Sequence, residues 1–187
     1  MRWEEQGVTG QNRYAVIPRT LCFLIRGDSV LLLRGAPTKR IWPNKLNGIG
    51  GHIEPNEDVW SSARREIREE TGLNVEHLHL AGIIHIEGIP PAPGVLITAF
   101  VAPIDSIDIT PSQEGQLEWH RLSSLPKTDL VEDLPELIPR LLASMRRGHI
   151  LYGHYRANEK GEMLFSFKEH PQLAPTALDD KIEPDAL

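Results

Sequence analysis

The sequence predicts a single α+β domain. Segments with strand periodicity alternate with two helical segments, and neither an internal repeat nor a linker divides the 187 residues. Hydrophobic residues make up 40% of the chain and charged residues 25%, which permits a packed core and argues against intrinsic disorder. We expect a domain over residues 18–169, an N-terminal extension over 1–17 and a flexible acidic tail over 170–187.

Composition excludes several classes of protein. The single cysteine, Cys22, rules out an internal disulfide and any multi-cysteine metal site, and its apolar strand context predicts a buried thiol. No apolar run reaches the roughly 18 residues that span a bilayer, and residues 1–8 lack the apolar core of a secretory signal. A net charge of −6 disfavours a nucleic acid polymer or an anionic membrane as partner. We therefore expect a cytoplasmic protein.

The first predicted elements form a hairpin. Residues 19–26 and 29–33 are apolar strand-like runs that flank Gly27-Asp28, a turn signal. Residues 34–47 follow as a long loop rich in glycine, proline, lysine and arginine. A glycine-dense turn over 48–54 then leads into a helix.

The helix is predicted over residues 58–71. Asn56 is a possible N-cap, acidic residues stand at the start of the segment, and Gly72 follows its end. A second helix is predicted over 135–147, where apolar residues recur at helical spacing and basic residues close the segment. The remaining strands are expected at 75–87, 95–102, 117–122, 152–157 and 163–168.

Three carboxylates stand on one face of the first helix. Glu66, Glu69 and Glu70 are spaced i, i+3 and i+4, and they border the apolar arc of the same helix. Crowded carboxylates repel one another unless a cation neutralises them, and such oxygen ligands suit Mg²⁺ or Mn²⁺. The alternative is a solvated face whose glutamates pair with neighbouring arginines.

The surrounding segment favours the metal site. Gly51, five residues, Glu57, seven residues and then REIREETGL over 65–73 resembles the Nudix box at nine fixed positions in 23 residues. The resemblance implies the Nudix fold, an α/β/α sandwich with a mixed sheet between helices. It also implies a hydrolase of nucleoside diphosphates that are linked to another group.

The same resemblance assigns roles to residues of the box. Glu66, Glu69 and Glu70, together with the Gly50 carbonyl, would hold Mg²⁺, with Mn²⁺ as an alternative. Arg65 would orient the glutamates, and Glu57 would tie the loop to the helix. The implied catalytic residues are Glu66, Glu69 and Arg65, with Glu66 preferred as the base that accepts a proton from water.

A further acidic ligand is expected from a later loop. Glu114 is the preferred candidate and Glu118 the reserve, although a solvated loop glutamate fits the sequence equally well. For the phosphates, positive charge is available from Arg34, Lys39, Arg40 and Lys45.

Substrate residues follow from a wider likeness. Residues 19–168 resemble the Nudix branch that hydrolyses oxidised purine nucleoside triphosphates such as 8-oxo-dGTP, in which residues matching Thr20 and Asn47 line the base pocket. An aspartate pair reads the purine edge in that branch, whereas here Asp133 is followed by Leu134. Trp42 is either a stacking platform for a base or a loop anchor packed on the core.

These observations predict a Mg²⁺-dependent pyrophosphohydrolase that cleaves a nucleoside triphosphate to a monophosphate and pyrophosphate. The alternative enzyme acts on nucleoside diphosphate sugars or dinucleotides such as ADP-ribose. The alternative from another class is a nucleotide-binding regulatory module without catalysis. A homodimer is compatible with all three.

Overall fold

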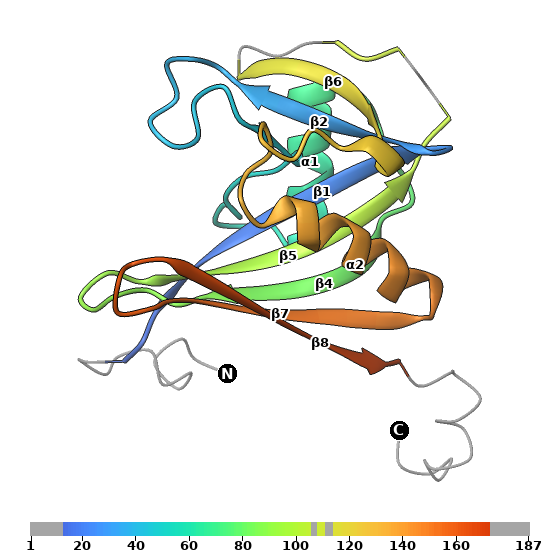
Figure 1. The fold of residues 1–187 in the computed structure, drawn as a ribbon. Helices are drawn as coiled ribbons and strands as arrows, with labels where there is room; N and C mark the ends of the chain where they lie inside the picture. Colours follow the sequence, from blue (N-terminus) through green and yellow to red (C-terminus); the bar gives the residue numbers. More distant parts are fainter. Residues whose placement is uncertain (1–12, 106–107, 111–113, 173–187) are drawn as a thin grey trace, which may run out of the picture.

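The computed structural model describes residues 13–105, 108–110 and 114–172. A mixed sheet forms the centre of the protein (Figure 1), and it has eight strands. The strand order is β3-β2-β1-β5-β4-β7-β8, and β6 pairs with β2 outside this path. The pairs β1–β5 and β4–β7 are parallel, while the other pairs are antiparallel. The strands are β1 (Val16–Arg26), β2 (Ser29–Gly35), β3 (Leu46–Asn47), β4 (His79–Ile86), β5 (Gly94–Pro103), β6 (Gly115–Arg121), β7 (His149–Ala157) and β8 (Met163–Pro171).

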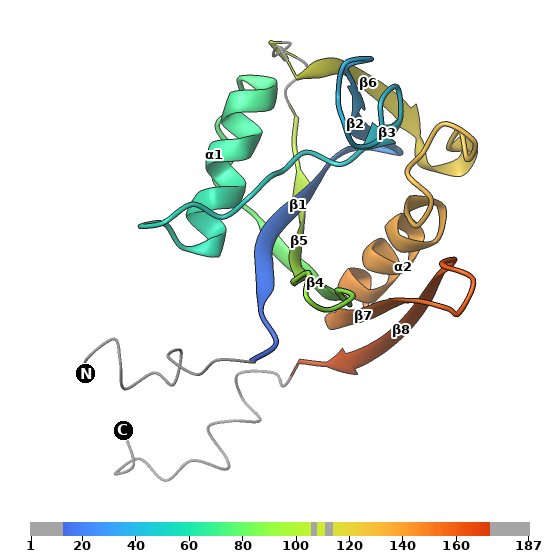
Figure 2. The same ribbon diagram turned by 90° about the vertical axis from the view of Figure 1, so that its left-hand side faces the viewer.

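One helix covers each face of the sheet, which confirms the α+β class and the α/β/α sandwich. Turned by 90°, the molecule shows α1 (Val59–Thr71) on one side of the strands and α2 (Leu134–Arg146) on the other (Figure 2). A short 3₁₀ helix, η2 (Leu122–Ser124), leads from β6 toward α2. Neither α1 nor α2, the helices of the described ranges, is long and apolar enough to cross a membrane.

Helix α1 begins and ends for local reasons. The side chain of Asp58 accepts hydrogen bonds from the backbone N–H groups of Trp60 (2.8 Å) and Ser61 (3.0 Å), so the N-cap is Asp58 and the expectation of Asn56 was wrong. Asn56 instead adopts a positive φ of 74° in the preceding turn. Gly72 closes the helix at φ 75°, where its N–H bonds the Arg68 carbonyl.

The α1 face of the sheet has its own core. Ala63 and Ile67 on α1 are fully buried in a cluster with Cys22 and Leu24 of β1 and Leu31 of β2. The prediction of a buried Cys22 is confirmed, and burial raises the pKa of its thiol well above the ordinary range. This packing fixes the rotation of α1, and therefore the direction in which its glutamates point.

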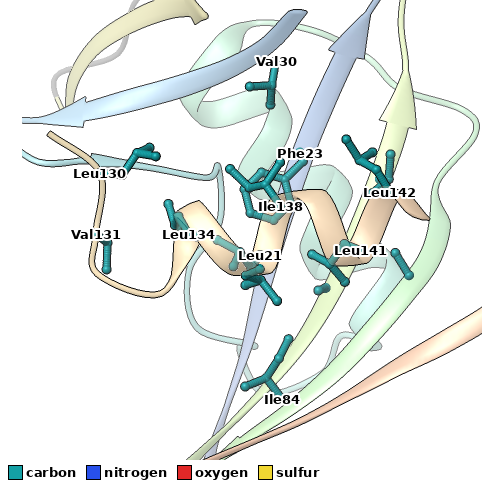
Figure 3. Packing of buried hydrophobic residues seen from close by; sticks show 14 of the residues in the cluster. Leu21, Phe23, Val30, Ile84, Leu130, Val131, Leu134, Ile138, Leu141 and Leu142 are labelled. Carbon is teal, nitrogen blue, oxygen red and sulfur yellow. The ribbon is translucent and has the colours of Figure 1, made fainter. Parts of the chain in front are cut away.

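Helix α2 packs on the opposite face. In Figure 3, Ile138 and Leu141 of α2 point toward Leu21 and Phe23 of β1, with Ile84 of β4 close by. The apolar residues recur at helical spacing along α2, so one side of the helix is buried and the other is solvated. This packing places the start of α2 beside the strands that carry the candidate site.

Some predicted boundaries differ from the structure. Residues 75–78 were expected in a strand, but β4 begins at His79, because Val75 and Leu78 pack into the α1-side core instead of pairing with β5. The sheet extends two residues beyond each end of the 18–169 range, since β1 begins at Val16 and β8 ends at Pro171. Residues 1–8, and the tail beyond 172, lie outside the described residues.

Candidate active site

The three glutamates of α1 differ in burial. Glu70 is only 4% exposed, the Glu66 side chain is 13% exposed and the Glu69 side chain is 53% exposed. The order follows from the helix, because Glu70 lies nearest the buried Ile67 arc and Glu69 faces solvent. The predicted acidic face therefore runs from the core outward.

A glycine loop closes over this face. The N–H of Gly50 donates to Glu70 Oε2 at 3.1 Å. Gly50 has a φ of 145° and packs directly on the Thr20 backbone, so a side chain here is excluded. A Cβ on Gly51 would overlap the Glu66 carboxylate. Gly50 is thus required by its contact with the β1 backbone, whereas a side chain at Gly51 would displace the Glu66 carboxylate.

The loop is fastened to β1 by backbone hydrogen bonds. The N–H of Thr20 donates to the Gly51 carbonyl at 2.9 Å, and Cys22 and Ile49 exchange two bonds at 2.7 and 3.0 Å. These bonds pin the glycine segment against β1, and the Gly50 carbonyl remains a predicted metal ligand.

Arg65 connects the loop to the glutamates. Its Nε and Nη2 donate to Glu57 at 3.0 and 2.7 Å, and its Nη1 donates to Glu66 and Glu69 at 2.8 and 3.1 Å. A further bond reaches the His52 carbonyl at 3.1 Å. Hydrogen bonds from Arg65 lower the pKa of Glu57 to about 2, and the same bonds raise the pKa of Arg65. The guanidinium therefore stands at the centre of the box.

Glu70 is a buried acidic group without an ion pair among the described residues. Burial raises the pKa of Glu70 to about 8, and repulsion from Glu114 and Glu66 adds to this increase. The hydrogen bond from the Gly50 N–H acts in the opposite direction and lowers the pKa. The pKa of Glu66 is also raised, mainly by burial. Such a pocket of carboxyl oxygens is an environment that a hard divalent cation would relieve.

The glutamates do not converge on one point as their side chains stand. Within the described ranges, no three histidine, cysteine, aspartate or glutamate side chains form a group that could hold a metal ion. The reason is visible in the hydrogen bonds, because Arg65 draws Glu66 and Glu69 toward itself while Glu70 faces the Gly50 N–H. Carboxylate oxygens are ligands that suit Mg²⁺. Here the side-chain directions of Glu66 and Glu69 are set by their hydrogen bonds to Arg65.

The two later glutamates take different partners. Glu114 forms an ion pair with Lys39 at 2.8 Å, and its charge raises the pKa values of Glu66 and Glu70. Glu118, the reserve candidate, pairs with Arg34 and accepts a bond from His120 at 3.0 Å. Of these two glutamates, Glu114 is the one whose charge acts on Glu66 and Glu70.

Arg34 is engaged in the same network as Glu118. Besides that pair, its Nη1 donates to the Asn44 carbonyl at 2.9 Å and its Nη2 lies 3.4 Å from Asp129. The pKa of Arg34 is raised, chiefly by its bond to Glu118. Arg34 therefore braces the loop after β2, and it lies outside the lining of the two cavities described next.

A basic cavity of about 300 Å³ opens beside Glu70. Its cationic lining is Arg19, Lys39, Arg40 and Lys45, and His52 joins them. Three of these four were in the predicted basic cluster, whereas Arg19 was missed. The sequence held one indication of its role, because Arg19 directly precedes Thr20, a predicted substrate-binding residue.

A second, more apolar cavity of about 400 Å³ adjoins the first. The two share six lining residues: Arg19, Ile41, Trp42, Asn47, Gly48 and Gly50. Trp42 lines both cavities and is 46% exposed, so it is not a loop anchor packed in the core. The site is one continuous cleft with a charged half and an apolar half.

The predicted base-binding residues meet in the apolar half. Thr20, Asn47 and Asp133 all line it. Thr20 is 3% exposed, and its Oγ1 has no hydrogen-bond partner within the described part of the chain. Asn47 accepts a bond from the Gly48 N–H at 2.8 Å through Oδ1, which leaves its amide N–H₂ as a donor. Burial raises the pKa of Asp133.

Comparisons with known proteins bear on the family and the fold of the chain. The family model described as NUDIX domain matches residues 16–141. A mouse protein named oxidized purine nucleoside triphosphate hydrolase is 29% identical over 153 residues, which cover 80% of this chain and 93% of the relative. An uncharacterized Nudix hydrolase of Bacillus subtilis, YvcI, is 31% identical over 163 residues, which cover 82% and 94%. The crystal structure of a MutT protein from Bacillus halodurans is similar with a TM-score of 0.66 and 25% identity, covering 84% of this chain and 100% of that one.

Proposed function

The chain belongs to the Nudix family of hydrolases, and from this premise we propose that it is a Mg²⁺-dependent pyrophosphohydrolase of purine nucleoside triphosphates. The products are a nucleoside monophosphate and pyrophosphate, formed when water cleaves the phosphoanhydride bond between the α and β phosphorus atoms. One observation carries the proposal. The buried Glu70 lines a basic cavity that continues directly into an apolar cavity.

The charged half suits a triphosphate. Arg19, Arg40 and Lys45 supply positive charge to the lining of the cavity that Glu70 of α1 also lines. Nudix proteins as a family use divalent metal ions, and the carboxylates of Glu66, Glu69 and Glu70 with the Gly50 carbonyl are the oxygens that would hold Mg²⁺ here. When bound, the ion neutralises phosphate charge and lowers the pKa of water.

Within this site the chain itself supplies the remaining groups. We assign Glu66 as the base that takes a proton from the attacking water, because its carboxylate is largely buried and its pKa is raised by that burial. Arg65 holds the Glu66 carboxylate at 2.8 Å and so fixes its direction. Glu57 in turn fixes Arg65 through two hydrogen bonds.

The apolar half suits a purine base. Thr20 and Asn47 offer donors, Asp133 offers an acceptor, and Trp42 offers an aromatic face at the mouth. The name of the mouse relative supports an oxidised purine. Leu134 stands where the second aspartate of that branch would be, so the choice between oxidised and ordinary purines rests on Asp133.

The test is a panel of nucleoside triphosphates, diphosphate sugars and ADP-ribose with Mg²⁺, in which released pyrophosphate and phosphate are measured. We expect pyrophosphate from a purine triphosphate, and a loss of at least about 100-fold in Glu66→Gln and Glu70→Gln. Glu76→Gln, at an exposed loop position, is the matched control.

Other outcomes would contradict the proposal. Full activity in both glutamate variants would refute the metal-site assignment. Turnover of ADP-ribose in preference to every triphosphate would identify the alternative enzyme. Tight binding of a nucleotide without turnover would identify a regulatory module.

A further inference from the structure

The N-terminus of α2 departs from the usual capping arrangement. Asp133 occupies the N-cap, a position where aspartate is among the preferred residues, yet its side chain makes no capping hydrogen bond. The same residue type at the N-cap of α1, Asp58, bonds two backbone N–H groups. Pro135 contributes to the difference, since it removes one of the N–H groups that a capping carboxylate would bind.

The Asp133 carboxylate bonds a tyrosine instead. The hydroxyl of Tyr155, on β7, donates to Asp133 Oδ2 at 3.0 Å. Tyr155 is 3% exposed, and its ring is held edge-on by Phe165 and Phe167 of β8 at centroid distances of 4.7 and 5.7 Å. The donor is therefore rigid, and it belongs to the sheet, not to the helix it acts upon.

This bond lies at the wall of the apolar cavity. Asp133, Tyr155 and Phe165 all line that cavity, together with Thr20 and Asn47. The Tyr155 bond engages one lone pair of Oδ2, and a carboxylate has about four acceptor sites, so Asp133 retains acceptor capacity for a ligand in the cavity. A carboxylate that makes no capping bond and is instead held by a buried tyrosine at a cavity wall is suited to ligand recognition.

We propose that Tyr155 is a positioning residue for substrate selection, whose hydroxyl fixes Asp133 as a hydrogen-bond acceptor for N–H groups on the edge of a purine base. The inference rests on the proposed function, because it takes Asp133 to be the group that contacts the base. Bases that present N–H donors at this point are selected, and bases that present a carbonyl there are repelled by the carboxylate.

The test compares Tyr155→Phe with wild type in the full chain. The substitution removes one oxygen and keeps the ring between Phe165 and Phe167. For the preferred purine triphosphate we expect KM to rise on the order of tenfold while kcat changes less than about twofold, as for loss of one hydrogen bond to a charged group. For a pyrimidine triphosphate, KM is expected to change little, so that base discrimination falls.

Tyr152→Phe is the matched control, because Tyr152 lies on the same strand, is 43% exposed and lies outside the cavity lining. A double variant separates positioning from packing. In an Asp133→Ala background, Tyr155→Phe should cause no further loss of discrimination. An equal loss in that background would mean that Tyr155 acts through the packing of β7, and this would overturn the proposal.

Two further measurements keep the result decisive. Asp133→Asn changes the acceptor of the same hydrogen bond. It should lower the discrimination between purine and pyrimidine triphosphates, as Tyr155→Phe does. A crystal structure of the Tyr155→Phe protein is a second readout, and it does not depend on enzymatic activity. The proposal requires the carboxylate of Asp133 to leave its position at the cavity wall, and an unmoved carboxylate would overturn it. If wild type cleaves no nucleotide but the carboxylate moves, the proposed function fails while the positioning contact stands.

Discussion

Arg65 and Glu57 form a two-point ion pair that joins the active-site helix to the loop before it. Nε and Nη2 of Arg65 donate to the two carboxylate oxygens of Glu57 at 3.0 and 2.7 Å, and the Glu57 side chain also accepts the Glu54 N–H at 2.8 Å. A lysine cannot reproduce this planar fork. The remaining nitrogen of Arg65 is thereby aimed at Glu66 and Glu69.

Arg65→Lys should therefore lower activity more than it lowers stability. Loss of a partner that orients metal ligands typically costs about 10–100-fold in activity or metal affinity, and we expect kcat with Mg²⁺ to fall within that range. Arg68→Lys, three residues on at an exposed position of α1, is the control and should retain kcat. Equal losses in the two variants would show that the fork has no orienting role.

The Glu57–Arg65 pair also predicts a pH dependence of stability. The folded pKa of Glu57, about 2, lies below its ordinary value of 4.5, since hydrogen bonds from Arg65 stabilise the carboxylate. Its contribution to the free energy of unfolding is therefore complete above about pH 4.5 and is lost as the pH falls toward 2. Denaturant midpoints of wild type and Glu57→Gln should differ most above pH 4.5 and converge in acid. A difference that stays constant across this window would refute the assignment.

Gly51 and Gly82 provide a paired prediction on the role of small residues. A Cβ at Gly51 would meet the Glu66 carboxylate, whereas a Cβ at Gly82 would meet Leu141 of α2 and the Leu151 backbone. We expect Gly51→Ala to reduce kcat strongly with a small change in Tm. Gly82→Ala should lower Tm by several degrees, as overpacking costs about 1–3 kcal/mol, with less effect on kcat. Thermal unfolding and kcat measured on both proteins check the pair.

Short-range signals in the sequence were sufficient to predict α1 and its glutamates. The apolar positions at Ala63 and Ile67 mark the buried face and Gly72 marks the end of the helix within one stretch of chain, whereas the N-cap was expected at Asn56 and is Asp58. The sequence placed the acidic face beside the apolar arc, and the structure shows that Glu70 is its buried member. The strand expected from residue 75 failed for the opposite reason, because apolar residues alone do not distinguish a paired strand from a packed loop.

Contacts between distant segments were beyond such signals. The pairing of Lys39 with Glu114 joins two loops 75 residues apart, and the bond from Tyr155 to Asp133 depends on β7 lying beside the start of α2. Neither contact leaves a local pattern, since both depend on sheet order. The same holds for Arg34, whose charge suggested phosphate binding but whose partners are Glu118 and Asp129.

The burial of Glu70 implies that the active site costs stability when no metal is bound. Its side chain is 4% exposed, accepts one hydrogen bond from Gly50, and forms no ion pair with any residue in the described ranges. Glutamine keeps the acceptor for the Gly50 N–H and removes the ionisable group. In EDTA at pH 7.5, Glu70→Gln should therefore be more stable than wild type by about 1 kcal/mol, which corresponds to a Tm about 2–4 °C higher.

Magnesium should reverse this order. A ligand that binds only the folded state stabilises it by about 2.7 kcal/mol at a concentration of 100 times Kd, so saturating Mg²⁺ should raise the Tm of wild type above that of Glu70→Gln. Glu76→Gln, which alters an exposed carboxylate, should follow wild type with and without the ion. A Glu70→Gln protein that is less stable than wild type in EDTA would show that groups of the protein already balance this carboxylate. An equal response to Mg²⁺ in both proteins would show that Glu70 is not a ligand.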